Sequence, residues 1–164
     1  MSQKLRPPAL DPATIKPSFG TGYPDEHRAP CEQREKRAVG DALGLSHFGV
    51  NITRLPPGAW SALRHWHANE DEFIYIVEGA LTLVTNEGRQ VLTPGMVAGF
   101  PAGSADGHQL VNEGAGVAVY LEVGDRSKDE VVEYPDVDMR LVRKAGSRRF
   151  ERRDGTPYPP RRAT

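Results

Sequence analysis

The stretch HWHANEDE, residues 65–72, decides how this chain is expected to fold. Side chains on a β-strand alternate between its two faces, so His65 and His67 point the same way while Trp66 points to the other face. Two imidazoles on one face can bind a single metal ion, and the acidic group just downstream offers an oxygen ligand. A third histidine, His108, follows one hairpin later. Two neighbouring parts of a β-barrel can therefore assemble a His/His/carboxylate/His site.

Three adjacent acids, Glu70, Asp71 and Glu72, are candidates for the carboxylate ligand. Glu72 opens the next strand with its side chain facing inward, whereas the same alternation points Asp71 away from the metal. Glu72 is therefore preferred and Asp71 is the alternative, with Glu70 and Asp71 interpreted as solvated rim residues. The expected ligands of one divalent metal ion are His65, His67, Glu72 and His108. Neutral imidazoles with one carboxylate suit Fe, Mn, Zn, Ni or Cu.

The spacing of these residues resembles the two sequence motifs of the cupin family. The first motif comprises Gly58, His65, His67, Glu72 and Gly79, with one extra residue in its first gap. The second comprises Gly95, Pro101, Gly103, His108 and Asn112, with two extra residues between Gly103 and His108. The resemblance covers roughly residues 44–123. It implies a double-stranded β-helix, or jelly roll, with a metal in its interior, and the single His-x-His motif implies one cupin domain.

The pattern of the chain by itself predicts an all-β protein. Phe48, Val50 and Ile52 alternate with small and polar residues, and further short strands are expected over 60–67, 72–77, 131–135 and 139–142. Gly and Pro separate these strands, and no long helical pattern lies between them, which favours an antiparallel sandwich or barrel. We expect an extended N-terminal arm over 1–43, the barrel over 44–124, and C-terminal strands with a basic tail over 125–164.

Composition narrows the class of protein further. With 164 residues and a net charge of −1, the chain fits one domain with no general attraction to nucleic acid or to an anionic membrane. Cys31 is the only cysteine, which rules out an intrachain disulfide and suits a reducing compartment. The N-terminal residues lack an apolar signal region, and no stretch approaches membrane-spanning length. These features together predict a cytoplasmic location.

Strand alternation also predicts which side chains share the interior with the metal. The expected pocket residues are Ser61, Leu63, Ile74, Ile76, Leu110 and Asn112. Such a pocket has aliphatic walls and few polar groups, as small-molecule sites commonly do. No second inward carboxylate or lysine is expected, so proton transfer would fall to metal-bound water, to Glu72, or to Asp106 at the mouth. Glu72 and Asp106 are thus the candidate catalytic residues.

Two classes of function fit this site. The first is a metal-dependent enzyme acting on a small oxygenated molecule, and the cupin resemblance implies an isomerase or a dioxygenase. The second is a non-catalytic module that binds or senses a small ligand of the sugar or carboxylate type. In the family, such modules often lie beside a DNA-binding helical domain, for which residues 1–43 contain too much Pro and Gly.

Two surface features bear on partners. Arginines and a lysine make the last part of the chain basic: Arg140, Arg143, Lys144, Arg148, Arg149, Arg152, Arg153, Arg161 and Arg162. A solvated tail or an exchanged strand is the favoured interpretation, and binding of a phosphate or carboxylate on a ligand is the alternative. Phe73, Tyr75 and Val77 should face outward as an apolar strip that needs cover, so we expect a homodimer.

Overall fold

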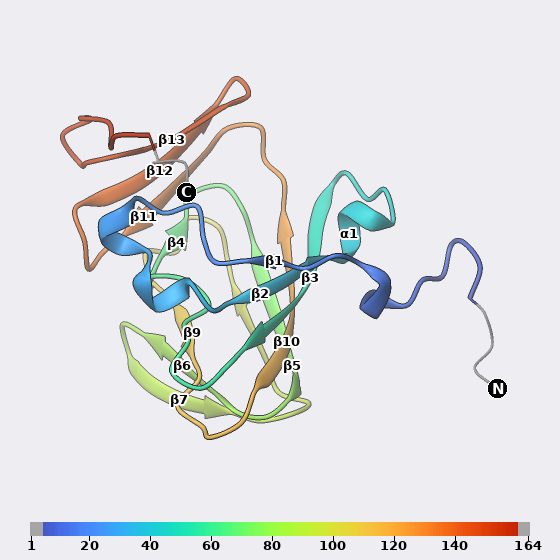
Figure 1. The fold of residues 1–164 in the computed structure, drawn as a ribbon. Helices are drawn as coiled ribbons and strands as arrows, with labels where there is room; N and C mark the ends of the chain where they lie inside the picture. Colours follow the sequence, from blue (N-terminus) through green and yellow to red (C-terminus); the bar gives the residue numbers. More distant parts are fainter. Residues whose placement is uncertain (1–4, 161–164) are drawn as a thin grey trace.

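The computed structural model describes residues 5–160, and nearly all of its regular structure is β (Figure 1). Three short 3-10 turns (Pro12–Thr14, Asp25–His27 and Ala29–Cys31) and one short helix, α1 (Val39–Ala42), lie in the first part of the chain. The strands are β1 (Ser18–Phe19), β2 (Glu35–Ala38), β3 (Phe48–Leu55), β4 (Trp66–His67), β5 (Glu72–Glu78), β6 (Leu81–Thr85), β7 (Gly88–Leu92), β8 (Val97–Phe100), β9 (Gln109–Val111), β10 (Ala118–Asp125), β11 (Glu130–Tyr134), β12 (Met139–Lys144) and β13 (Ser147–Glu151).

Two antiparallel sheets form the barrel. The larger has the strand order β1-β2-β3-β10-β5-β8 and the smaller has the order β7-β6-β9. On β5 the side chains alternate as expected, because Ile74 and Ile76 are buried while Tyr75 is exposed. The inward side chains of both sheets make one apolar core: Leu55, Ala59, Ile74, Ile76, Leu81, Leu83, Leu92, Leu110, Ala118 and Tyr120. The predicted all-β architecture is therefore confirmed.

The turn after β5 requires glycine. Gly79 has a φ of +74°, and a Cβ added there would lie 2.9 Å from the Cα of Ala118. A side chain would therefore meet both backbone strain and a clash with the neighbouring strand. This glycine lets the chain turn from β5 in the larger sheet into β6 in the smaller one.

A third sheet lies beside the barrel, at the top of Figure 1, with the order β13-β12-β11-β4. It encloses a second apolar core, made of Tyr23, Cys31, Leu63, Val132, Tyr134, Met139, Leu141 and Tyr158. The sequence predicts strands close to β11 and β12 but no strand in the basic segment that follows. β13 occupies that segment and pairs with β12 of the same chain, so this part is not a solvated tail. Arg161 and Arg162 lie outside the described residues.

The N-terminal arm is likewise built into the fold. β1 pairs with β2, and β2 pairs with β3 at the edge of the larger sheet. Tyr23 and Cys31 reach the second core from the 3-10 segment between these strands. The arm thus covers the barrel from outside, a contact between distant segments that strand alternation alone does not predict.

The expected strand over 60–67 forms only at its ends. Trp60 bridges Val111, and His65 bridges His108, so the register shifts by two residues between the two bridges. Within the shift, Leu63 turns from the barrel into the second core, where it is 8% exposed. The simple alternation used to place Leu63 with the histidines is therefore wrong.

The outer face of β5 is uncovered, as expected. Phe73, Tyr75 and Val77 are each 40–50% exposed, and Val97 on the neighbouring β8 is 54% exposed. This apolar strip is the basis of the expected homodimer, which stays a prediction. No helix among residues 5–160 has the length and apolarity needed to cross a membrane.

Candidate metal centre

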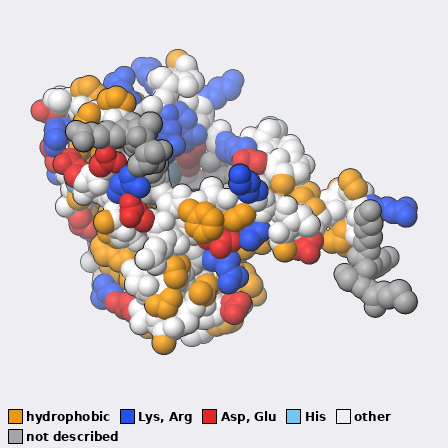
Figure 2. Space-filling model, in the orientation of Figure 1, with side chains coloured by type: hydrophobic (Ala, Val, Ile, Leu, Met, Phe, Trp, Pro, Cys, Tyr) orange, Lys and Arg blue, Asp and Glu red, His pale blue; other side chains and the backbone are white. Residues whose placement is uncertain are grey.

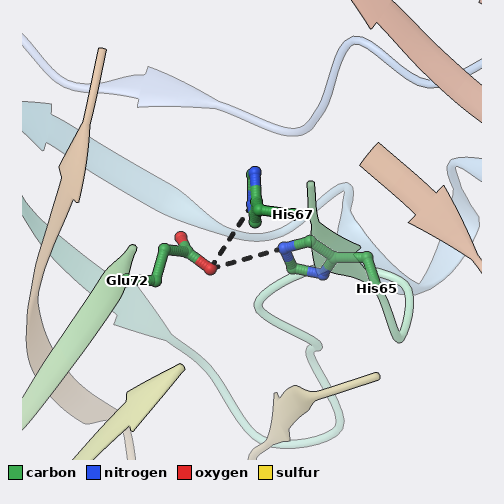
Figure 3. Close-up of side chains that lie close together, drawn as sticks. All are labelled: His65, His67 and Glu72. Carbon is green, nitrogen blue, oxygen red and sulfur yellow. Dashed lines mark ion pairs between the residues drawn. The ribbon is translucent and has the colours of Figure 1, made fainter. Parts of the chain in front are cut away.

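Three of the expected ligands, the imidazoles, converge on one carboxylate oxygen of the fourth, Glu72. The Nε2 atoms of His65, His67 and His108 lie 3.6, 3.5 and 2.9 Å from Oε2 of Glu72. Figure 3 shows Glu72 reaching from β5 towards the two imidazoles that β4 and the segment before it present. Nitrogen and oxygen atoms of His65, His67 and Glu72 lie within 4.8 Å of one another, a spacing that could hold a metal ion.

Hydrogen bonding prepares one imidazole for a metal. Nδ1 of His65 lies 2.8 Å from the carbonyl oxygen of Leu63, so Nδ1–H donates to that oxygen. Nε2 then carries the free lone pair, which is the atom that faces Glu72. The Nδ1 atoms of His67 and His108 are buried and have no hydrogen-bond partner among the described residues.

The charges of the site also suit a cation. Burial lowers the pKa of His67 to about 4, and burial likewise lowers the pKa of His108. Burial alone would raise the pKa of Glu72, but its hydrogen bonds to His108 and His65 hold that pKa well below its usual range. Neutral imidazoles and an ionised carboxylate are the protonation states in which these groups bind a metal. The residues present therefore fit one divalent first-row ion.

Aromatic rings fix two of the imidazoles in place. The Phe100 ring stacks on His108 with centroids 3.5 Å apart and planes 4° apart. Tyr134, from β11 of the third sheet, stacks over His65 at 5.9 Å and 29°. The third sheet thus contacts the centre directly, through Tyr134 and through the pairing of β4 with β11.

Behind His67 lie two further carboxylates that the sequence did not place there. Oε2 of Glu70 is 3.6 Å and Oε2 of Glu130 is 4.0 Å from Nδ1 of His67. Glu130 is fully buried and accepts backbone N–H bonds from Ala68, while Glu70 pairs with Arg143 at 2.9 Å. The expectation that Glu70 is a solvated rim residue is wrong, because β11 and β12 cover it. These acids favour a hydrogen on Nδ1 of His67, which leaves its Nε2 for the metal.

Asp71 lies apart from the histidines. Its side chain is exposed, and its Oδ1 accepts a hydrogen bond of 2.7 Å from the backbone N–H of Ala102. The structure therefore places Glu72 rather than Asp71 at the centre. Alternation on β5 identified this acid from the sequence.

The centre opens into a cavity of about 360 Å³. Of the expected pocket residues, Ser61, Ile74 and Leu110 line it. Leu63, Ile76 and Asn112 do not. Leu63 lies in the second core and Ile76 in the barrel core, where it is fully buried.

Asn112 has a structural role in place of the expected pocket role. Its Nδ2 donates to the carbonyl oxygens of Leu55 and Gly116, at 2.7 and 2.8 Å, and its Oδ1 accepts from the N–H of Gly114. The side chain therefore ties the end of β3 to the loop that precedes β10. The spacing that identifies Asn112 cannot distinguish this role from ligand binding.

Polar side chains that the sequence analysis missed also line the cavity: Arg34, Lys36, Tyr120, Glu122, Tyr134 and Arg148. The expectation of no second inward carboxylate or lysine is therefore wrong. Glu122 and Tyr120 share the inward face of β10, so alternation applied to that strand would have found them. Lys36 and Arg148 come from the arm and the tail, whose positions no local pattern reveals.

Asp106, the other candidate for proton transfer, is held in a loop. Its Oδ1 accepts a hydrogen bond of 2.7 Å from the N–H of Asn86. It lines a separate hollow of about 50 Å³ beside His67 and His108 rather than the main cavity. Its position therefore suits holding the β6–β7 hairpin more than transferring a proton to a ligand.

Comparison with known proteins gives a consistent result. The family profile described as Cupin domain matches residues 51–124. The chain is similar to the solved structure of a sugar phosphate isomerase of the cupin superfamily from Silicibacter pomeroyi, with 45% identity over 92% of this chain and 96% of that one and a TM-score of 0.89. None of the curated proteins matches the chain.

Two further solved structures extend the comparison. One, from Acidithiobacillus ferrooxidans, is provisionally named a sugar phosphate isomerase; it is 33% identical, the alignment covers 73% of this chain and 76% of that one, and the TM-score is 0.69. The other, a Cupin 2 conserved barrel domain protein from Salinispora arenicola, is 20% identical over 77% of this chain and 92% of that one, with a TM-score of 0.52. The latter likeness concerns the fold alone.

Proposed function

The chain belongs to the cupin superfamily and has its double-stranded β-helix fold, and on that premise we propose that it is a metal-dependent sugar phosphate isomerase. The observation that carries the proposal is the 45% identity to the Silicibacter pomeroyi sugar phosphate isomerase over nearly the whole of both chains. That alignment covers 92% of this chain, so it extends beyond the barrel. The histidine and glutamate cluster supports the dependence on metal.

Interconversion of an aldose and a ketose moves one proton between two neighbouring carbons. A base removes the proton from the hydroxyl-bearing carbon beside the carbonyl and returns it to the former carbonyl carbon, while the hydroxyl proton passes to the former carbonyl oxygen. No oxidant or other reactant is consumed. A divalent ion bound by His65, His67, Glu72 and His108 would supply a Lewis acid for the two substrate oxygens.

Glu122 is the residue best placed to transfer the proton. It lies on the inward face of β10, its side chain is 16% exposed, and it lines the same cavity as Glu72. Lys36 pairs with Glu122, and Asn51 donates to the same carboxylate at 3.0 Å. These contacts fix the direction of the carboxylate, as a general base requires. Glu72 is less free to act as a base because it faces three imidazoles.

Apolar side chains complete the cavity. Ile74, Leu110 and Phe100 line its walls beside the polar groups. Such walls limit the water around a bound substrate and strengthen the electrostatic interactions inside. An enediol species formed during the reaction would thereby be shielded from side reactions.

The test is to incubate the metal-loaded protein with a panel of pentose and hexose phosphates in D₂O and follow them by NMR. We expect interconversion of an aldose phosphate and a ketose phosphate, with solvent deuterium incorporated at C1 or C2. Chelation should abolish both, and readdition of a divalent metal should restore them.

The same assay distinguishes the alternatives. Oxygen uptake without isomerisation would identify a dioxygenase and contradict the proposal. Saturable binding of a sugar phosphate with neither turnover nor deuterium incorporation would identify a ligand-binding module. Isomerisation that persists after complete metal removal would refute the metal-dependent mechanism.

A further inference from the structure

The cavity receives three cationic side chains from outside the barrel motifs. Arg34 precedes β2, Lys36 lies on β2, and Arg148 lies on β13, and all three line the same cavity as the histidines. Figure 2 shows Lys and Arg side chains gathered where the tail strands cover the barrel. Among residues 5–160, two carboxylates line this cavity, those of Glu72 and Glu122. One positive charge therefore remains uncompensated even before a metal is bound.

Arg34 is a cation without an acidic partner. Its guanidinium donates to the carbonyl oxygens of Ser61 and Gly20, the latter at 2.8 Å, and it makes no ion pair among residues 5–160. Its Nε atom is buried and has no hydrogen-bond partner in that range. Arg34 is half-buried and its Nε is fully buried, so a cation held only by neutral carbonyls here is a costly arrangement, which an anion in the cavity would relieve.

Arg148 has free donors. Within the described chain it makes no hydrogen bond or ion pair, and its guanidinium lies 5.5 Å from the centre of the Phe150 ring. By contrast its neighbour Arg149 pairs with Glu151 at 2.7 Å. A Cβ on Gly22 would lie 3.9 Å from the Arg148 guanidinium, in ordinary van der Waals contact, so this cation lies beside the Gly22 backbone of the arm.

Lys36 differs from the two arginines because it is already paired. Its ammonium contacts Glu122, which accounts for one of the two carboxylates. Glu72 faces the three imidazoles and is committed to the metal centre. The charges left for a ligand are therefore those of Arg34 and Arg148. A neutral sugar would leave them unmatched, whereas a phosphate accepts several hydrogen bonds from guanidinium groups.

We infer that Arg148 and Arg34 bind the phosphate group of the substrate. The inference rests on the proposed function for the identity of the ligand, but its geometry comes from residues that take no part in holding the metal. Arg34, tied to two carbonyls, is the fixed cation, and Arg148 on the exposed strand β13 closes on the phosphate. The barrel thus binds the reacting end of the substrate, while the arm and the tail select substrates that carry a phosphate group.

The test compares Arg148→Gln with Arg149→Gln, its neighbour on β13 and a matched control. Inorganic phosphate is titrated into the zinc-loaded full chain and followed by ³¹P NMR. We expect Arg148→Gln to weaken phosphate binding at least about 10-fold, the effect of losing one charge-assisted contact. Arg149→Gln should remain within about twofold of the wild type. Both variants should retain wild-type zinc affinity, which shows that the fold and the centre are intact.

Further variants test the role of Arg34. They also test whether phosphate binds to the metal instead of to the arginines. Arg34→Lys, which keeps the charge, should weaken phosphate binding less than Arg34→Gln does. Phosphate that binds only to the metal would be lost in His67→Ala and unchanged in Arg148→Gln, and this result would overturn the inference. Equal weakening by Arg148→Gln and Arg149→Gln would also overturn it, since it would indicate general surface charge.

These outcomes separate the inference from the proposed function. If Arg148→Gln loses phosphate but no sugar phosphate is isomerised by the wild type, the phosphate site stands and the isomerase proposal falls. If the wild type isomerises sugar phosphates and Arg148→Gln does so with an unchanged KM, the isomerase proposal stands and the phosphate site falls.

Discussion

The barrel and the sheet beside it contribute differently to this protein. The stretch from β3 to β10 carries all four candidate metal ligands, and most of its strands form the barrel, although β4 with His67 pairs into the third sheet. The second core joins Tyr23 and Cys31 of the arm to Met139 and Tyr158 near the other end of the chain. In the proposed function the barrel would provide the chemistry, whereas the arm and the tail contribute cationic side chains to the cavity lining. Under that proposal, reactivity and selectivity could vary separately within one fold.

The two regions meet at the metal centre. β4, which carries His67, pairs with β11 of the third sheet, and Tyr134 of β11 stacks over His65. Damage to the second core should therefore reach the metal, although no ligand comes from it. Substitutions in each region measure how far the two regions are independent.

The largest effect is expected from His67→Ala in the barrel. Loss of one imidazole ligand should lower metal affinity at least about 100-fold and abolish metal-dependent turnover, because the remaining donors no longer surround the ion. Metal content after dialysis and the NMR isomerisation assay measure the two effects. His47→Ala, an exposed histidine outside the site, is the control and should behave like the wild type. Equal loss in both variants would show that histidine removal acts through the fold.

The next effect concerns the acid that sequence analysis missed. Glu122→Gln should reduce turnover by roughly 10²- to 10⁴-fold, the usual contribution of a general base, with metal affinity retained. Asp106→Asn should stay within about threefold of wild-type turnover, because Asp106 holds a loop rather than facing the main cavity. Steady-state rates with matched metal content provide the measurement. A larger loss of turnover in Asp106→Asn than in Glu122→Gln would instead identify Asp106, at the mouth, as the residue that transfers the proton.

Alternation and motif spacing predicted the barrel and the cluster of three histidines and Glu72, because both are local properties of one stretch. This reasoning preferred Glu72 to Asp71, and Glu72 is the acid that faces the histidines; it also placed Ile74 in the pocket that Ile74 lines. The method failed at Leu63, where a two-residue register shift in an irregular segment breaks the alternation. It also missed Arg34 and Arg148, whose positions depend on contacts between segments far apart in sequence. Long-range packing, rather than any local pattern, places these cations.

Stability should show whether the two cores unfold together. Met139→Ala removes a fully buried side chain from the second core and should lower the free energy of unfolding by about 2–5 kcal/mol. Met96→Ala, at a residue 46% exposed, is the control and should change it by less than about 0.5 kcal/mol. Because β4 belongs to the third sheet, we expect a single transition and weaker metal binding in Met139→Ala. A separate early transition with unchanged metal binding would show that the second core is dispensable for the centre.

The smallest expected effect is the loss of stability of the second core at high pH. Burial raises the pKa of Cys31 to about 11 and that of Tyr23 to about 12. Folding therefore disfavours the ionised forms of both groups, so their contribution to stability is intact below about pH 9 and is lost as the pH rises towards 12.

At pH 8 the raised pKa alone should slow alkylation of Cys31 by iodoacetamide about 100-fold relative to the unfolded chain, because the thiolate is the reactive form. The rate should rise in Met139→Ala, where the second core is loosened, and stay unchanged in Met96→Ala. Rapid alkylation of the folded wild type at pH 8 would mean that the arm opens readily and that Cys31 is not held between the arm and the third sheet.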